Sequence, residues 1–580
     1  MYDRFPYIAC GTPEECLAGW TEIIAAFENQ RSSPITVIEC YPGVLLEELK
    51  EAVASRLPEA ELVCTEQLFR DPRQIDEWLS PWLGDDPVFG MMNAVEIESF
   101  FDVARFNAAR AQCERTQRRT IVFGPGASLV CPAPGLLVYA DMARWEIQKR
   151  QRRNQICNLG TDNFEERASL KYKRAFFVDW RAADRLKRRV LEKIDYLLDT
   201  NVPGEPKSIS GEAFRRGLEK AVRRPFRVVP FFDPGPWGGH WMERVCGLPP
   251  DGEPNHAWCF DCVPEENSLL LGFGDQRVEI PSIDVVFAHP EELLGREIVS
   301  RFGAEFPIRF DFLDTVGGGN LSLQVHPLTS YIRKHFGMDY TQDESYYMLD
   351  AEDDACVYLG LKEGVDKDAM VSDLERAQEE DFDFPAEKYV NRFPARKHDH
   401  FLIPAGTIHC SGKNSMVLEI SATPYIFTFK LWDWGRLGLD GRPRPIHLRH
   451  GIDNIQWDRS SEWVRRSLIN RVEQLRSGDG WREERTGLHE LEFIETRRHW
   501  FTRMVPHDTQ GSVHVLNLIE GERIAVESPT SAFDPFFVHY AETFIVPACV
   551  GAYTIRPCGT DAGHEYGTIE ARVRLDRVRG

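Results

Sequence analysis

One short stretch of the sequence places a glutamine and a histidine side by side. Residues 320–332 read NLSLQVHPLTSYI, with apolar side chains at alternate positions from Leu321 to Val325. A period of two is typical of a β-strand with one buried face. Gln324 and His326 therefore share the opposite face, where both can point at a common ligand.

Two further side chains complete a donor set for a metal ion. Glu344 begins another alternating run in TQDESYYMLD, and His409 follows a Pro-Ala-Gly turn in HDHFLIPAGTIHCSG. With Gln324 and His326 they offer two nitrogens and two oxygens, which suit zinc or another divalent first-row metal that keeps an open position for substrate. Each residue alone has an ordinary explanation, as a strand-end histidine or a solvated strand-edge charge. Together they favour a metal site over coincidence.

The elements that must position these residues differ between the two parts of the chain. All 16 histidines lie at or after His240. Residues 1–205 alternate short β-branched runs with long charged helical stretches, which predicts βαβ units and a parallel sheet. After them, closely spaced strand signals broken by Gly, Pro and Asp predict a mainly-β region, a sandwich or a barrel such as a jelly roll, with helical inserts at 364–380 and 460–476. We expect an α/β domain followed by barrels.

A repeated turn indicates a second barrel. The segment FLIPAGTIH from Phe401 recurs as FIVPACVGAY from Phe544, where no histidine follows the turn. The expected domains are therefore a metal-binding one at 225–484 and a metal-free, structural barrel at 485–580. Four histidines of the second barrel lack a paired spacing, and ordinary core or surface positions are expected for them: His499, His507, His514 and His539.

Two other spacings have weaker implications. Cys259 and Cys262 form a Cys-x-x-Cys without the second pair that a zinc site requires. His398 and His400 form a His-x-His that could bind metal, but their place just before the Pro-Ala-Gly turn favours a polar loop.

Composition limits the partners and the compartment. The chain of 580 residues is too long for one core, and its formal net charge of −22 disfavours phosphate backbones and anionic lipid. No apolar run reaches about 18 residues, and the N-terminal MYDRFPYIAC lacks the apolar stretch of a signal peptide. We expect a cytoplasmic protein that binds neither nucleic acid nor membrane.

The α/β domain lacks the signals of a phosphate-binding loop. The stretch ITVIECYPGVLLEELK offers only Gly43, without the lysine that such a loop requires, and FGPGAS is a lone Gly-x-Gly that fits a strand-to-loop turn. The domain faintly resembles a nucleoside-kinase-like fold without its phosphate loop. No partner for residues 1–205 follows from the sequence. Five basic side chains could bind anions, although a solvated helix face is the more usual role: Arg144, Arg150, Lys171, Lys173 and Arg174.

The second half of the chain resembles type I mannose-6-phosphate isomerase, a zinc-dependent enzyme of the cupin superfamily. Pro-x-Gly-x-x-His is the second half of the cupin pattern. The resemblance spans roughly residues 225–575 and rests on motifs in a fixed order: PGPWGGHW (234–241), LSLQVHP (321–327), ESYYMLDAEDDACVYLGLKEG (344–364), FLIPAGTIH (401–409), VLEI (417–420) and LWDWGRLGLDGRPRPIHL (431–448).

The resemblance implies roles for particular residues. Its zinc ligands fall on Gln324, His326, Glu344 and His409. Glu419 in VLEI matches an active-site acid and is the candidate proton carrier, with a structural carboxylate as the alternative. Asp433 and Arg436 in the intact DWGR are candidates for shaping the pocket or binding phosphate. Two positions depart from the family: Gln342 stands where a lysine is usual, and Lys430 where an arginine is usual, which removes a planar fork.

Two functions remain open at this level. The first is a metal-dependent aldose–ketose isomerase that interconverts mannose 6-phosphate and fructose 6-phosphate through a cis-enediol, with Glu419, Lys430 and Arg436 as catalytic residues. The second is a non-catalytic, metal-binding cupin that senses or scaffolds a sugar phosphate. The retained motifs favour the enzyme. An oxygen-using cupin enzyme would prefer more histidine ligands and ranks last.

Overall fold

The computed structural model describes residues 1–249, 253–379, 382–422, 425, 427–487, 489, 491–560 and 563–575. The chain forms two compact units. The N-terminal unit comprises Tyr7–Ala221 and Ser268–Ala288, and the barrel unit comprises Met1–Pro6, Val222–Asn267 and His289–Gly580. Within the described ranges, no helix is both long enough and apolar enough to cross a bilayer.

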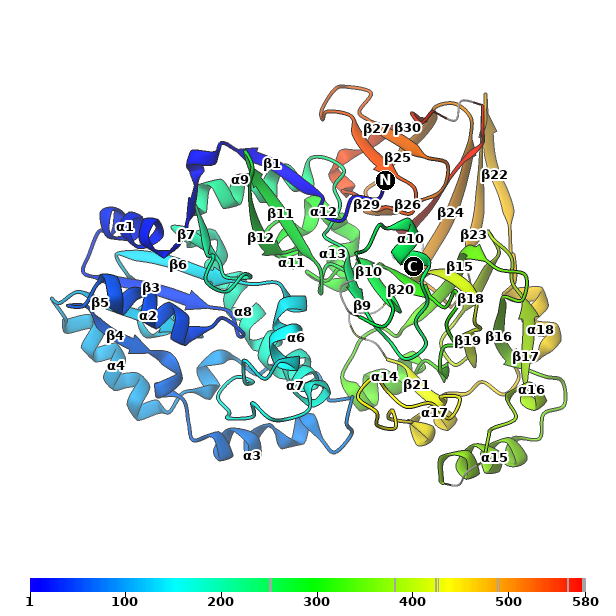
Figure 1. Cartoon of the computed structure of the whole chain (residues 1–580), viewed down its shortest axis with the longest axis horizontal. Coiled ribbons are helices and arrows are strands. Elements are labelled where there is room, and N and C mark those ends of the chain that lie inside the picture. Colours follow the sequence, from blue (N-terminus) through cyan, green and yellow to red (C-terminus); the bar gives the residue numbers. More distant parts are fainter. Residues whose placement is uncertain are drawn as a thin grey trace. The chain divides into compact units, whose positions relative to one another are not determined.

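The N-terminal unit is built on a seven-stranded sheet with helices packed alongside it (Figure 1). Its inner strands pair in parallel, whereas the two strands at one edge are antiparallel. In spatial order the strands are β2 (Cys16–Ala18), β8 (Lys207–Ser210), β7 (Tyr196–Asp199), β6 (Leu136–Asp141), β3 (Ile35–Cys40), β5 (Thr120–Gly124) and β4 (Glu61–Cys64). The longer helices are α1 (Trp20–Gln30), α2 (Leu46–Arg56), α3 (Pro72–Leu83), α4 (Val103–Arg115), α6 (Arg144–Arg152), α8 (Trp180–Val190) and α9 (Gly211–Val222).

The Gly-x-Gly turn after β5 is closed by a carboxylate of the chain itself. Glu39, near the end of β3, accepts hydrogen bonds from the backbone nitrogens of Gly126 and Ser128 at 2.6 and 2.8 Å, and from the Ser128 hydroxyl at 2.6 Å. Burial raises the pKa of Glu39 to about 7. The backbone donors that would meet a phosphate in a glycine-rich loop are therefore engaged by a side chain.

The basic side chains expected on a solvated helix face are instead buried. Arg144, Arg150, Lys171, Lys173 and Arg174 are at most 6% exposed. Arg144 pairs with Asp184 at 2.5 Å, and Arg150 donates to the carbonyl oxygen of Thr200 at 2.7 Å. The solvated-face interpretation was wrong because these side chains point at neighbouring loops and helices, where Lys171 donates to the carbonyl oxygen of Phe164 and Arg174 pairs with Asp76. Their cations stabilise loops and carboxylates of the unit.

A second chain segment completes the N-terminal unit. Strands β11 (Ser268–Phe273) and β12 (Gln276–Pro281) form a hairpin, and β1 (Tyr7–Gly11) adds to it in parallel. The following helix α11 (Ile283–Ala288) brings Asp284 to Lys187 of α8. This buried ion pair gives a physical reason why residues 268–288 join a unit that the sequence order separates from them.

The first barrel of the barrel unit consists of two antiparallel sheets (Figure 1). The six-stranded sheet contains β18 (His400–Ile403), β15 (Asp343–Ala351), β20 (Ser415–Ala422), β13 (Arg309–Asp314), β10 (Trp258–Cys262) and β9 (Phe231–Asp233). The five-stranded sheet contains β17 (Val390–Pro394), β16 (Cys356–Leu361), β19 (His409–Ser411), β14 (Leu323–Val325) and β21 (Phe429–Trp432). Such a pair of sheets buries one face of each, as the short, closely spaced strand signals predicted.

The C-terminal barrel repeats this plan. Its six-stranded sheet contains β22 (Glu473–Gly478), β23 (Trp481–Gly487), β24 (Ile494–Phe501), β31 (Tyr566–Val573), β26 (His514–Glu520) and β29 (Thr543–Val546). Its four-stranded sheet contains β25 (Val505–Asp508), β30 (Ala552–Pro557), β27 (Arg523–Glu527) and β28 (Phe536–His539). A cluster of fully buried apolar side chains, among them Phe501, Leu516 and Ile555, fills the space between the sheets.

Two local predictions are corrected by the structure. A helix expected over 460–476 ends early: α18 spans Ser461–Ser467, Asn470 has a left-handed φ of 49°, and the chain then enters β22. His400 does not lie in a polar loop, because it begins strand β18 and is 1% exposed. The insert expected over 364–380 is α15 (Lys367–Glu379), and residue 380 lies outside the described residues.

We expect the buried lysine of the N-terminal unit to be essential for its stability. Lys187 Nζ lies 2.6 Å from Asp141 and also contacts Asp284, and all three side chains are at most 1% exposed. Lys187→Met would leave two carboxylates buried without a cation, which typically costs about 3–5 kcal/mol. Chemical denaturation should show a lower unfolding midpoint for this variant, with the exposed Lys193→Met as control. Equal midpoints for the two variants would contradict this role.

Candidate functional site

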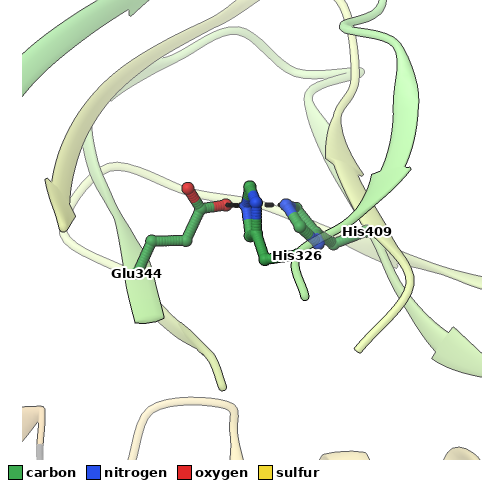
Figure 2. A group of neighbouring side chains, drawn as sticks. All are labelled: His326, Glu344 and His409. Atoms are coloured by element: carbon green, nitrogen blue, oxygen red, sulfur yellow. Dashed lines mark ion pairs between the residues drawn. The ribbon is translucent and has the colours of Figure 1, made fainter. Parts of the chain in front are cut away.

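Two sheets of the first barrel bring three predicted metal ligands into contact. His409 begins β19 and pairs directly with Gln324 of β14. His326 is the first residue after β14 and precedes Pro327. Glu344 comes from β15 in the opposite sheet. Figure 2 shows the two imidazoles and the carboxylate converging. Segments far apart in the sequence thus meet because the two sheets face one another.

The Pro-Ala-Gly turn positions His409. Gly406 has a φ of 87°, and a Cβ there would lie 3.0 Å from the carbonyl oxygen of Asn454. The backbone nitrogen of Gly406 donates to the carbonyl oxygen of His326 at 2.9 Å. A glycine is needed at this position because the backbone is left-handed and the neighbouring chain is close. The turn therefore binds the His326 segment and begins β19 beside it.

The contacts within the group orient the ring nitrogens. His326 Nε2 and His409 Nε2 lie 3.1 and 2.6 Å from Glu344 Oε1. The opposite nitrogens face backbone carbonyl oxygens, His326 Nδ1 at 2.8 Å from Phe427 and His409 Nδ1 at 2.9 Å from Thr407. Carbonyl partners on Nδ1 are the usual outer contacts of metal-binding histidines, since they leave Nε2 as the free donor.

Gln324 completes the group through its amide. Its Nε2 atom lies 3.1 Å from His409 Nε2. The two ends of an amide have nearly the same shape, so a rotated side chain would present its oxygen to the same point. Gln324 therefore lies where a fourth ligand is needed.

Burial and charge dominate the electrostatics of the group. The side chains of His326, Glu344 and His409 are 0% exposed. Burial would lower the pKa of His326, but the Glu344 carboxylate outweighs it and raises this pKa above its usual value. Burial would likewise raise the pKa of Glu344, yet the two imidazoles hold it well below its usual range.

The residues present fit a bound divalent cation. His326 Nε2 and Glu344 Oε1 are buried and contact each other as an ion pair, but neither makes a hydrogen bond of good geometry in the described structure. The three side chains form a group whose donor atoms lie within 4.8 Å of one another. Two nitrogens and a carboxylate oxygen are donors that zinc and its neighbours prefer. A cation would satisfy atoms that are otherwise costly to bury.

A cavity of about 270 Å³ opens beside this group. Its lining includes Gln324, Gln342, Glu419, Lys430 and Arg444. Burial, followed by the charges of Glu344 and Asp311, raises the pKa of Glu419 well above its usual value. Burial and then Arg444 lower the pKa of Lys430 to about 7. The cavity therefore combines a candidate metal ligand with acidic and basic groups whose protonation is altered by burial.

Gln342 links two carboxylates at this cavity. Its Nε2 atom lies 3.1 Å from Glu344 Oε2 and 3.5 Å from Glu419 Oε1, and its Oε1 atom accepts a hydrogen bond from the backbone nitrogen of Phe427. A neutral amide thus lies where the family pattern has a lysine.

Arg436 lies behind the cavity wall. Its Nε and Nη2 atoms donate to Asp433 Oδ1 at 3.0 and 2.7 Å. Asp433 also accepts from Arg444 Nη1 at 2.9 Å, and Arg444 lines the cavity together with Arg309. Sequence reasoning missed Arg444, although it lies in the quoted motif LWDWGRLGLDGRPRPIHL, and it missed the other lining residues Trp237, Arg309 and Asp311.

Fold and site together define a cupin-like barrel with a candidate metal centre. In comparisons with known proteins, this part of the chain is similar in sequence to one group of enzymes. It is 24% identical over 237 residues to mannose-6-phosphate isomerase ManA of Bacillus subtilis, covering 40% of this chain and 68% of that protein. It is 27% identical over 218 residues to mannose-6-phosphate isomerase of Streptococcus mutans, covering 37% of this chain and 63% of that protein. The chain thus spans roughly two thirds of the length of these relatives.

Solved structures and a family model add two facts. The mannose 6-phosphate isomerase structure from Bacillus subtilis overlaps with a TM-score of 0.49 at 18% identity, over 60% of this chain and 100% of that one. Residues 19–223 match a domain of unknown function, DUF8485. The resemblance to mannose-6-phosphate isomerases is confirmed for about 40% of the chain.

We expect the two histidines to be required for metal binding. His326→Ala and His409→Ala each remove a buried donor, so purified full-length protein should lose one equivalent of divalent metal relative to the wild type. Elemental analysis measures this directly. The control is His398→Ala, which removes a partly exposed histidine that contacts Glu520 at 3.1 Å. Wild-type metal content in both site variants would refute the assignment.

Proposed function

We propose that the first barrel is a metal-dependent aldose–ketose isomerase that acts on mannose 6-phosphate and fructose 6-phosphate. The observation that carries the proposal is the buried His326–Glu344–His409 group at a cavity that contains a further carboxylate, Glu419. The relatives' isomerase activity supports it. Zinc is the proposed ion, because two imidazoles and oxygen donors suit it.

The cavity has the charges that a sugar phosphate requires. Lys430, Arg444 and Arg309 line it together with the aromatic side chain of Trp237. An arginine side chain can bind two phosphate oxygens through parallel hydrogen bonds. The guanidinium of Arg444 is oriented by the Asp433 carboxylate, 2.9 Å from its Nη1 atom. We assign Arg444 to the phosphate, with Arg436 as the residue that positions Asp433.

The reaction moves one proton between the C2 and C1 carbons of the sugar. In this assignment the ionised carboxylate of Glu419 takes the proton from C2 of mannose 6-phosphate and returns it to C1, while a second proton moves from the C2 hydroxyl to the C1 oxygen, so that the cis-enediol becomes fructose 6-phosphate. A cation bound at Glu344 would offset the carboxylate charge that raises the pKa of Glu419. Gln342 orients the Glu419 carboxylate. Lys430, with a pKa of about 7, supplies positive charge in its protonated form close to the developing enediolate oxygen. The bound cation would stabilise that charge at the sugar oxygens.

Gln342 and Lys430 depart from the family pattern, and these departures favour one alternative function, a cupin that binds a sugar phosphate without turnover. Gln342 replaces a charged donor by a neutral one beside Glu419. In that case the protein would bind metal and sugar phosphate but convert neither sugar. The two functions are separated by an assay of the purified protein, in which fructose 6-phosphate formation is followed by a coupled reaction on metal-replete samples.

Glu419→Gln should abolish isomerisation and leave the metal in place. The substitution preserves shape but removes the proton acceptor, and loss of a general base typically lowers the rate by about 10²–10⁴-fold. Coupled kinetics and elemental analysis on the same sample test this. Wild-type kcat in Glu419→Gln would show that Glu419 is a structural carboxylate.

Arg444→Met should weaken binding of the phosphorylated sugar more than it slows the chemistry. Loss of a charged hydrogen bond to phosphate typically costs about 1.5–3 kcal/mol, so KM should rise by roughly 10–100-fold. The exposed Arg442→Met in the same segment is the control, with KM unchanged. An unchanged KM in Arg444→Met would place the phosphate elsewhere.

A further inference from the structure

The C-terminal barrel contains a second group of buried imidazoles. His499 of β24, His507 of β25 and His514 of β26 lie near Glu570 of β31, and these side chains are at most 1% exposed. The Nε2 atom of His499 also lies 3.6 Å from the Glu483 carboxylate of β23. The sequence indicated unrelated core or surface positions for the histidines. The structure shows that three of them are grouped, because strand pairing rather than sequence spacing brings them together. Only His539 lies apart, 3.4 Å from Glu542.

The group lies between the two sheets of the barrel. Each histidine lies two residues from a member of the apolar core in the same strand. These core residues are Phe501 for His499, Val505 for His507 and Leu516 for His514. Because side chains two apart in a strand share a face, all three imidazoles point into the barrel. His507 belongs to the four-stranded sheet and the others to the six-stranded sheet. The group therefore spans both layers.

The distances fit a common ligand better than direct hydrogen bonds. His507 Nδ1 lies 3.3 Å from Glu570 Oε2. A direct hydrogen bond to a carboxylate would be about 2.7–2.9 Å. Two donors on a tetrahedral zinc ion, each about 2.0–2.1 Å from it, are about 3.4 Å apart. Donor atoms of His499, His507 and Glu570 also lie within 4.8 Å of one another.

Several polar atoms of the group lack a hydrogen-bond partner in the described structure. They are both ring nitrogens of His499, Nε2 of His507 and of His514, and Oε2 of Glu570. Leaving buried polar atoms without partners is costly. A bound cation would compensate several of these atoms at once.

Neighbouring residues give the group the charge state that a cation needs. Arg572 Nε lies 2.6 Å from Glu570 Oε1, which leaves Oε2 facing the imidazoles. A guanidinium on Oε1 favours the ionised carboxylate, which is the form that binds metal.

Tyr553 holds the histidines from the return strand. It follows the repeated turn FIVPACVGAY and pairs with His507 across β25 and β30. Its ring stacks on that of His507 at a centroid distance of 4.8 Å, and its hydroxyl lies 2.9 Å from His514 Nδ1. The second turn segment thus ends in a contact to the histidines, one position beyond the one that His409 holds in the first.

We propose that His499, His507 and Glu570, beside His514, bind a second divalent first-row transition metal ion, with zinc as the best match. The ion is structural: it ties the two sheets of the C-terminal barrel together. Complete burial of the group leaves no side for a substrate, as is usual for closed structural sites and unlike the cavity of the first barrel.

Metal counting on the full-length chain tests the proposal independently of catalysis. The wild type loaded with zinc should hold two equivalents, and His326→Ala should retain one. Adding Glu570→Gln to His326→Ala should remove the remaining equivalent, while adding His400→Gln, which alters a buried histidine outside both groups, should not. A metal-free His326→Ala chain after zinc loading would overturn the proposal.

A second measurement covers variants that fold poorly. In the His326→Ala chain, cobalt(II) alone should produce the visible absorption of a tetrahedral nitrogen and oxygen site, and a chelator should lower Tm. His507→Gln in the wild-type background should lose one of two equivalents while retaining the ion of the first barrel. Absence of cobalt absorption, or an unchanged count in His507→Gln, would contradict the second site. Isomerase activity does not enter either readout.

Discussion

The buried carboxylate of Glu344, which faces two imidazoles from the opposite sheet, is the constraint on which the first barrel depends. Its Oε1 atom lies 3.1 and 2.6 Å from the Nε2 atoms of His326 and His409. A carboxylate without exposure to water requires positive charge nearby. The strand pairing, the glycine turn at Gly406 and the backbone carbonyls on both Nδ1 atoms all serve to place that charge between the two sheets.

The same burial shapes the cavity beside the group. Glu419 lies near Glu344 and Asp311, so its pKa is raised, first by burial and then by these carboxylates. The amide of Gln342 lies between Glu344 and Glu419 without adding charge. Positive charge in the cavity therefore comes from Lys430, Arg444 and Arg309. The substitution at Gln342 redistributes charge toward the part of the cavity where a phosphate would bind.

Sequence reasoning identified what depends on local pattern. Alternation placed Gln324 and His326 on one face, and the turn motif identified His409, because both signals lie within a few residues. It could not identify Arg444 as the cavity arginine, since that depends on how Asp433 is shared with Arg436. The helix expected beyond residue 467 failed because pairing of β22 with β23 outweighs local propensity.

Long-range pairing also explains the larger omissions. Asp284 joins Lys187 across almost a hundred residues of sequence, and the grouped histidines of the C-terminal barrel come from separate strands. Neither arrangement leaves a regular spacing in the sequence. Basic residues on helices were similarly misplaced, because a local pattern does not show which loops and carboxylates the tertiary fold brings against a helix.

Hydrogen exchange at the sugar carbons is the most direct measurement of the central claim, that the first barrel moves a proton between C2 and C1. Metal-replete wild-type protein is incubated with mannose 6-phosphate in deuterated water and followed by NMR. The account predicts that fructose 6-phosphate appears and that solvent deuterium accumulates at its C1 and at C2 of mannose 6-phosphate. Protein that holds its metal and binds the sugar phosphate, yet yields neither product nor deuterium at either carbon, would contradict it.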